Sequence, residues 1–147
     1  MAENVDTMRK RNHAYKPKPL IPTLGFAYTK EHALQLKLMP HTALEALRTG
    51  DATEDNISTI IIRLDWGVIL IKNHFDQEQA GRVMNDGLNA VISLQNRSKD
   101  LGRYIATGEE LKAIGDALNA VDDMQDTTTR REQWLALNEV QRTCARL

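Results

Sequence analysis

Apolar residues recur at intervals of three or four positions along most of the chain, which is the period of a helix that buries one face. The clearest stretch is 54–73. Its apolar stripe consists of Ile57, Ile61, Leu64, Val68 and Ile71. The β-branched runs in this stretch also resemble buried strands, but Asp65 and the polar residues before Ile57 fit a helix better. We therefore predict a helix over 54–73.

Two further helices are indicated by capping signatures that precede apolar stripes. Asp76 with Gln79 opens a helix over 77–101, and Thr107 with Glu110 opens another helix that begins near residue 108. The stripe of the first is Ala80, Met84, Gly87, Val91, Leu94, Ser98 and Leu101. The stripe of the second is Leu111, Ile114, Leu118 and Val121. The small residues of the first stripe would let another helix approach closely.

A proline interrupts the helical pattern before residue 50. Several leucines between positions 34 and 47 lie close to a helical period, but Pro40 lacks a backbone N–H and disrupts a helix interior. We predict two short helices, 29–38 and 41–49. Gly50 is placed for a left-handed C-terminal cap and Thr53 for the N-cap of the next helix, which gives a tight connection.

The C-terminal region leaves two arrangements open. Beyond residue 121 the stripe of the helix that begins near 108 meets polar side chains, and the next strong stripe lies about 160° round the helix. This second stripe is Leu137, Val140, Cys144 and Leu147. Residues 122–130 are rich in Asp and Thr, which are poor helix formers and can form caps. Either a turn or one long helix with a polar middle fits, and we favour the long helix.

These elements predict an all-α fold, an antiparallel helical bundle of about four to five helices. The chain has 147 residues, of which 41% are hydrophobic and 27% charged, as suits one globular domain, which we place at 23–147. No apolar run is long enough to span a bilayer, and the N-terminus carries no apolar signal segment. A single cysteine cannot form an internal disulfide. We therefore expect a cytoplasmic protein without membrane contact.

The N-terminal region differs from the rest in charge. The whole chain has a formal net charge of −1, but residues 1–19 hold more basic than acidic side chains. Pro17, Pro19 and Pro22 block a helix there. We predict a flexible, extended, Pro-containing basic arm over 1–22. Its candidates for contact with a protein partner or with nucleic acid are Arg9, Lys10, Arg11, Lys16 and Lys18.

The sequence carries no pattern typical of catalysis or of a metal site. No two histidines have the spacing that places a pair of ligands on one helix face, and the motifs of phosphate-binding loops and nucleophilic serines do not occur. Cys144 lies on an apolar stripe with no base beside it in the pattern. We expect a protein that is not an enzyme and uses no cofactor or metal; an enzyme for small molecules would need a deep pocket with converging polar groups.

A DNA-binding function is the alternative. Residues 41–64 follow the order helix, glycine-containing turn, helix, which many DNA-binding domains share. Asn56, Ser58 and Thr59 are the candidates for base contacts, and the basic arm would reach phosphates. The acidic start of the second helix, with Glu54 before these residues, is unfavourable near phosphates.

The chain resembles small uncharacterised proteins carried by proteobacterial phages, prophages and plasmids. The resemblance lies in the Lys-Pro-Lys-Pro arm and in the stretch Leu36, Lys37, Leu38, Met39, Pro40, His41, Thr42, Ala43, Leu44, followed by Gly50, Asp51, Ala52 and Thr53. Met39 and Pro40 depart from the smoother helical run of that group. The resemblance implies an accessory protein of a mobile element, without catalytic residues. Such proteins often bind a host or phage protein stoichiometrically, including to inhibit a defence system.

The sequence thus predicts a non-enzymatic protein that acts by binding another macromolecule. The candidate residues on the domain are Trp134, Leu137 and Val140, because their apolar face has no obvious partner inside the chain. The basic arm supplies the other candidates. The same apolar face would also suit self-association, as in a homodimer.

Overall fold

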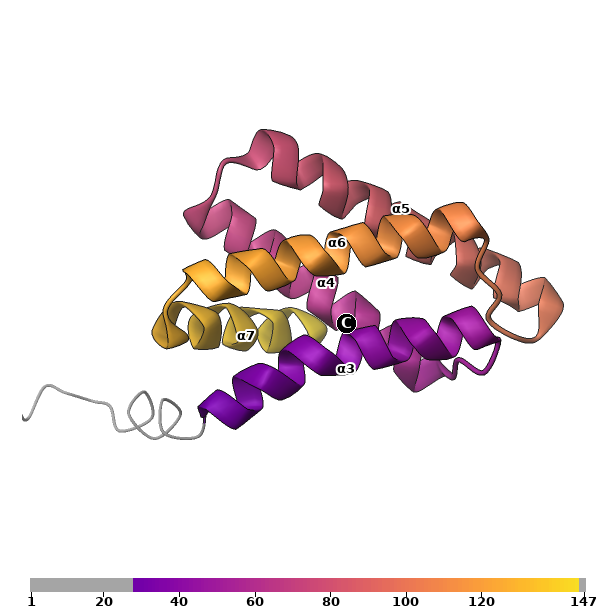
Figure 1. Cartoon of the computed structure of the whole chain (residues 1–147), viewed down its shortest axis with the longest axis horizontal. Helices are drawn as coiled ribbons and strands as arrows, with labels where there is room; N and C mark the ends of the chain where they lie inside the picture. The colour runs from indigo at the N-terminus through magenta and orange to yellow at the C-terminus, as the bar shows by residue number, and fades with distance from the viewer. Residues whose placement is uncertain (1–27, 146–147) are drawn as a thin grey trace, which may run out of the picture.

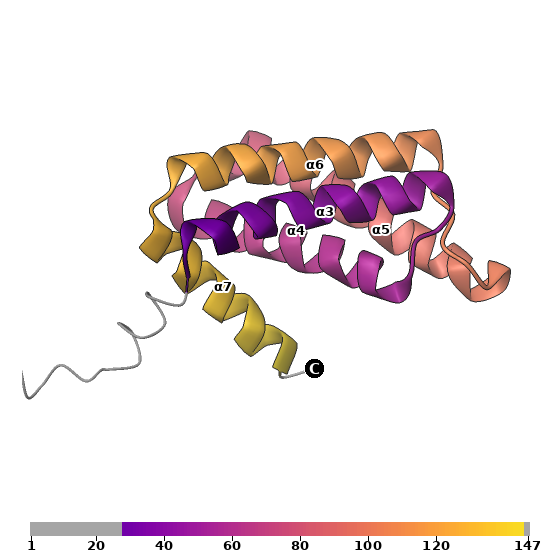
Figure 2. The ribbon, with the colours of Figure 1, turned by 60° about the horizontal axis from the view of Figure 1, so that its bottom comes forward.

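The computed structural model describes residues 28–145, which form five α-helices (Figure 1). The helices are α3 (Lys30–Thr49), α4 (Glu54–His74), α5 (Gln77–Leu101), α6 (Gly108–Thr127) and α7 (Arg130–Ala145). Consecutive helices from α3 to α6 run back and forth beside one another, and α7 packs on α4 at an angle to the other helices (Figure 2). The predicted all-α bundle is confirmed. The predicted arm, 1–22, lies outside the described residues.

Helix ends follow the predicted caps. Gly50 ends α3 in the left-handed conformation with φ 82°, which glycine adopts without a steric penalty. Thr53 and Thr107 begin α4 and α6 with capping boxes. Asp76 is the N-cap of α5 as predicted, but its side chain accepts from the backbone N–H of Glu78 and the capping box predicted with Gln79 is not formed. Between Tyr28 and Ala145, none of these helices is long and apolar enough to cross a membrane.

The predicted interruption at Pro40 is wrong, because α3 runs through it as one helix. The lost hydrogen bond and the ring of an interior proline cost about 3 kcal/mol. Pro40 is itself buried, and beyond it Leu44 and Leu47 are buried in the core. Burying a leucine contributes roughly 1.5–3 kcal/mol, so the packing of the second half of α3 offsets the defect. Tertiary contacts keep the helix continuous where the local rule would break it.

The favoured single long helix near the C-terminus is also wrong, because α6 ends at Thr127 and α7 begins at Arg130. Thr129 forms a capping box: its hydroxyl accepts from the N–H of Glu132 at 3.1 Å, and its own N–H donates to Glu132 Oε1 at 2.8 Å. This Thr-x-x-Glu signature is visible in the sequence and marks the start of a helix. The turn lets α7 point in a new direction.

α4 lies at the centre of the fold and packs against all four other helices. Its buried face is therefore wider than the predicted stripe. Ile57, Leu64 and Ile71 are buried as predicted, but Val68 is 39% exposed, and Trp66, which lies off the stripe, is buried. A helix enclosed on several sides buries apolar residues around most of its circumference, so a single stripe underestimates its core.

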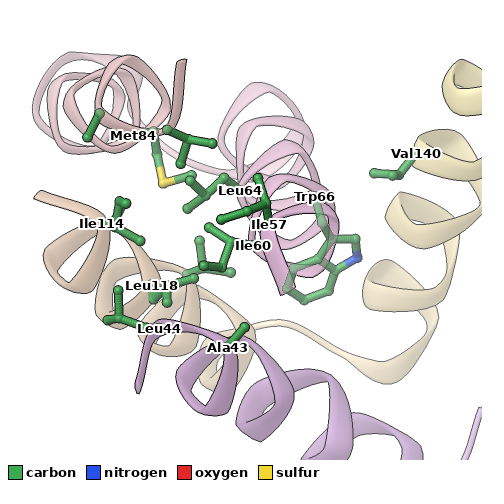
Figure 3. Packing of buried hydrophobic residues seen from close by; sticks show 14 of the residues in the cluster. Ala43, Leu44, Ile57, Ile60, Leu64, Trp66, Met84, Ile114, Leu118 and Val140 are labelled. Atoms are coloured by element: carbon green, nitrogen blue, oxygen red, sulfur yellow. The ribbon is translucent and has the colours of Figure 1, made fainter. Parts of the chain in front are cut away.

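The core lies where α4 meets α3, α5 and α6 (Figure 3). Its labelled members from these helices include Leu44, Ile57, Ile60, Leu64, Met84, Ile114 and Leu118. The stripe predicted for α5 is buried at Val91 and Leu94 but ends before Leu101, which is 49% exposed. The core thus occupies the middle of the bundle and leaves the far end of α5 outside it.

Small residues let the central helices approach closely. A Cβ added at Gly87 of α5 would lie 2.6 Å from Ala117 Cβ and 3.3 Å from the carbonyl oxygen of Ala113, both on α6. A Cβ at Gly67 of α4 would lie 2.5 Å from Val121 Cγ2. Distances this short would force a shift of the neighbouring helix. The predicted close approach at Gly87 is confirmed.

Candidate functional site

A groove separates α3 from α7, with α4 as its floor. It contains two adjoining hollows. The smaller, of about 170 Å³, is lined by Leu36, Met39, Pro40, Thr59, Ile62, Arg63, Trp66 and Leu137. The larger, of about 260 Å³, is lined by Tyr28, His32, Gln35, Leu36, Met39, Trp134, Leu137, Asn138 and Gln141. Leu36, Met39 and Leu137 border both hollows, so the two form one continuous groove, which we call the α3–α7 groove.

Hydrogen bonds hold the start of α7 in place at one end of this groove. Gln133 is buried near the start of α7, and its carbonyl oxygen accepts from Trp66 Nε1 at 3.0 Å. Its Oε1 accepts from Tyr28 Oη at 2.7 Å. Its Nε2 donates to the carbonyl oxygens of Gln125 and Thr128 at 2.9 and 3.1 Å. These bonds tie the first turn of α7 to α4, α6 and the start of α3.

Further along α7, the contact with α4 continues through apolar side chains. Val140 is 2% exposed and points toward the indole of Trp66 (Figure 3). α7 packs mainly on α4 rather than on α3. The face of α3 that bears Leu36 and Met39 is therefore left uncovered by α7, and this uncovered face is one wall of the groove.

The rim of the groove exposes large apolar side chains. Met39 of α3 is 53% exposed and Ile62 of α4 is 41% exposed, and both line the smaller hollow. Leu34 and Leu38, on the same helix as Met39, are also more than half exposed but line neither of these hollows. Exposed apolar side chains gathered around a hollow mark an interaction surface more strongly than scattered ones do.

Arg63 forms a positively charged part of the groove floor. Its guanidinium carbon lies 4.7 Å from the centre of the Trp66 ring, a cation–π contact, and its Nη2 donates to Asp122 Oδ1 at 2.9 Å. Burial lowers the pKa of Arg63, while the hydrogen bond with Asp122 raises it. An arginine keeps its charge at neutral pH even so. Within residues 28–145, its Nε and Nη1 have no hydrogen-bond partner.

The side chains that line the groove provide apolar contacts and hydrogen-bonding groups. The walls of the smaller hollow are almost entirely apolar, whereas the larger hollow adds the amides of Gln35, Asn138 and Gln141 and the imidazole of His32. Burial raises the pKa of the Tyr28 hydroxyl, which therefore stays protonated and donates to Gln133. These groups can recognise an apolar side chain with polar atoms beside it.

The structure brings together two of the three predicted partner-binding residues of the domain. Trp134 and Leu137 line the groove, whereas Val140 is buried against α4 and does not line it. Val140 therefore packs inside the chain, contrary to the expectation that its stripe lacks an internal partner. The basic arm residues Arg9, Lys10, Arg11, Lys16 and Lys18, the Cys144 side chain and Leu147 lie outside the described part of the chain.

The sequence did not indicate the α3 wall of the groove. Leu36 and Met39 lie off the leucine stripe of α3, and the expected break at Pro40 hid the fact that they share a helix with the residues beyond it. One signal in the sequence could have indicated this wall: the segment from Leu34 to Met39 contains more apolar residues than a helix can bury on a single face.

The candidate DNA-contact residues lie near the start of α4. Asn56 Oδ1 accepts from the Thr53 N–H at 2.8 Å in the capping box. The Thr59 hydroxyl donates to the carbonyl oxygen of Asp55 at 2.8 Å, and Thr59 lines the smaller hollow. Ser58 is exposed. None of these contacts adds support for DNA binding, which stays a prediction.

Other polar residues have local partners or lie apart from the groove. His74 Nδ1 lies 3.1 Å from Glu132 Oε2, which joins the ends of α4 and α7. Burial raises the pKa of Asp65, and in the described structure this carboxylate makes no ion pair, because Arg63 pairs with Asp122 instead. Between Tyr28 and Ala145, no three His, Cys, Asp or Glu side chains gather as metal ligands would.

No family model, curated protein or solved structure matches this chain. The resemblance to proteins of phages, prophages and plasmids therefore stays a prediction. The groove itself is the basis on which a function is proposed.

Proposed function

We propose that this protein is a non-enzymatic binding protein that holds a segment of a partner protein in the α3–α7 groove. The observation that carries the proposal is the pair of adjoining hollows, one apolar and one mixed, with both tryptophans of the chain in their walls. Tryptophan is among the residues most enriched at the energetic centres of protein interfaces.

The smaller hollow has the size and chemistry of a pocket for one apolar side chain. An apolar cavity of ~150 Å³ in another protein holds a benzene molecule. The hollow of about 170 Å³ therefore suits a phenylalanine or a leucine from the partner. Met39 at its rim is a flexible side chain that can adjust to the shape of such an anchor.

The larger hollow supports an amphipathic helix as the partner segment. Apolar side chains one turn apart on such a helix would contact Leu36, Met39 and Leu137, which border both hollows. Its polar side chains would face Gln35 and Gln141 at the rim. Grooves between helices bind amphipathic helices in this way because a helix leaves no backbone group unpaired when its apolar face is buried.

The resemblance to phage and plasmid proteins suggests where the partner is to be sought. Accessory proteins of mobile elements often bind a host or phage protein in stoichiometric complexes, and inhibition of a defence system is one use of such binding. We include inhibition of a defence system, by stoichiometric binding of a host or phage protein, in the proposal for this protein. A cytoplasmic location would fit it.

The test compares how well the wild-type full chain and two variants capture a partner. The two variants are substituted at positions that are equally exposed to solvent. Met39→Glu places a charge at the groove, and Ile92→Glu places the same charge on α5, away from the groove; each side chain is 53% exposed. A proteobacterial lysate, treated with nuclease, is passed over each tagged protein. We expect one stoichiometric protein that is retained by the wild type and by Ile92→Glu and lost with Met39→Glu.

Three outcomes would contradict the proposal. Equal retention by both variants would place binding elsewhere, and a capture that occurs only in a parallel lysate without nuclease would favour nucleic acid. A shift from dimer to monomer with Met39→Glu, without any captured protein, would assign the groove to a second copy of the chain. Circular dichroism of each variant establishes that the fold is intact before capture.

A further inference from the structure

We propose that residues 20–26 of this chain lie in the α3–α7 groove when no partner is bound. The groove begins at the point where the described chain begins. Tyr28 lines the larger hollow, is 5% exposed and donates its hydroxyl hydrogen to Gln133 Oε1 at 2.7 Å. The residues that precede Tyr28 are therefore tethered at the groove, which gives them a high effective concentration there.

The chemistry of this segment matches that of the groove. Residues 20–27 read Leu-Ile-Pro-Thr-Leu-Gly-Phe-Ala and contain no charged side chain. The walls they would contact are mostly apolar, with Arg63 in the floor of the smaller hollow and amides and His32 in the larger one. Pro22 favours an extended backbone and removes one donor that would otherwise need a partner. Leaving these apolar residues in water next to an apolar groove is the less favourable arrangement.

The length of the segment also fits. His32 and Pro40 mark the ends of the α3 wall and lie eight positions apart, which is about 12 Å along a helix. An extended chain covers that distance in about four residues. Alternate residues of an extended chain point to the same side, so Phe26 and Leu24 can face the groove together. Phe26, closer to Tyr28, would enter the larger hollow and Leu24 the smaller.

If residues 20–26 occupy the groove, they compete with a partner for it. A partner must displace residues 20–26 before it binds. This consequence rests on the proposed function, whereas the occupancy itself does not.

The first experiment maps the position of Phe26 in the purified, full-length protein. A benzophenone amino acid replaces Phe26 in one sample and Tyr15 in a control, and illumination is followed by mass spectrometry of the cross-linked peptides. We expect position 26 to cross-link within one chain to residues 32–40 or 134–141, and position 15 not to do so. Cross-links from position 26 to other helices only, or only between two chains, would overturn the inference.

The second experiment uses Trp134, which lines the larger hollow, while Trp66 is buried. Substitution of Leu24 and Phe26 by serine in the full chain should raise acrylamide quenching of tryptophan fluorescence, because the cover of Trp134 is lost. Ile92→Ser removes an apolar side chain from α5 and should leave quenching unchanged. Unchanged quenching in the Leu24→Ser, Phe26→Ser variant would overturn the inference.

The two proposals fail separately. Both experiments use the isolated protein, so their result does not depend on whether a partner exists. If the segment occupies the groove and the groove binds a partner, the Leu24→Ser, Phe26→Ser variant should capture more partner than the wild type. Cross-linking as expected without any captured partner would retain this inference and reject the proposed function.

Discussion

Arg63 of α4 and Asp122 of α6 form an ion pair in which Nη2 and Oδ1 lie 2.9 Å apart, and the other carboxylate oxygen lies 2.7 Å from His41 Nε2 of α3. One carboxylate therefore joins three helices beside the groove. The Arg63 side chain is 3% exposed and that of Asp122 is 15% exposed. A charge buried this deeply is tolerated because its partner is in place.

Removing only one member of this pair should destabilise the fold strongly. Asp122→Ala leaves the Arg63 guanidinium buried without its counter-charge, which costs about 3–5 kcal/mol. Urea unfolding followed by tryptophan fluorescence measures the loss, since Trp66 lies against Arg63. In the double variant Arg63→Met, Asp122→Ala, the buried charge is gone as well, and we expect part of the stability to return.

The exposed pair between Lys112 and Asp116 provides the control. Their side chains are 77% and 54% exposed, so Asp116→Ala should leave the unfolding midpoint almost unchanged. Equal effects of Asp122→Ala and Asp116→Ala would mean that the Arg63–Asp122 pair does not have the role described above.

Gly87→Ala should loosen the contact between α5 and α6. The added methyl group would meet Ala117 Cβ at 2.6 Å and force the helices apart, at a cost of about 1–3 kcal/mol. Gly81→Ala on the same helix has nothing within 4 Å of the new Cβ and should stabilise α5 by roughly 0.5–1 kcal/mol. Thermal unfolding distinguishes the two. Ala117→Gly combined with Gly87→Ala should restore part of the loss; a stabilising Gly87→Ala would contradict the close approach.

Thr129→Ala should weaken the start of α7 and hence the groove. The substitution removes the hydroxyl that accepts from the Glu132 N–H, and the loss of such a cap costs about 0.5–2 kcal/mol. Thr143, later on the same helix, donates its hydroxyl hydrogen to the carbonyl of Glu139, and Thr143→Ala should have little effect. Hydrogen exchange of the α7 amides measures both. Equal protection in the two variants would indicate that the cap contributes nothing.

Asp65 should make the protein less stable at neutral pH than it would be with a neutral side chain. Burial raises the pKa of Asp65 in the folded state, so the folded protein binds its proton more tightly than the unfolded chain does. Its contribution to stability therefore falls as the pH rises from about 4, the unfolded pKa, through the folded pKa, and the penalty persists at neutral pH.

Asp65→Asn tests this dependence. The variant should be more stable than the wild type at pH 7, and the difference should shrink as the pH falls below the unfolded pKa of aspartate. Asp86→Asn, at an exposed position on α5, is the control. The two proteins are compared by urea unfolding across the same pH series. A variant less stable than the wild type at pH 7 would show that the Asp65 carboxylate has a favourable partner in the folded state.

The groove illustrates which part of a binding site sequence reasoning can reach. Trp134 and Leu137 were identified because they are large apolar residues on a C-terminal stripe. Leu36, Met39 and Ile62 were not, because nothing in a linear pattern indicates which apolar side chains a neighbouring helix leaves uncovered. That depends on the direction of α7, which follows from hydrogen bonds of Gln133 to residues far away in sequence, such as Tyr28 and Trp66.

By itself, the sequence determined the helical class, the extents of α4 and α5, and the caps at Gly50, Thr53 and Thr107, because apolar periodicity and capping act within a few residues of one another. Only the tertiary structure decided that α3 continues through Pro40 and that Val140 is buried while Met39 is exposed. The reason is physical: these outcomes depend on free energies of burial between helices that are distant in the chain, and such burial can exceed the local cost of an interior proline.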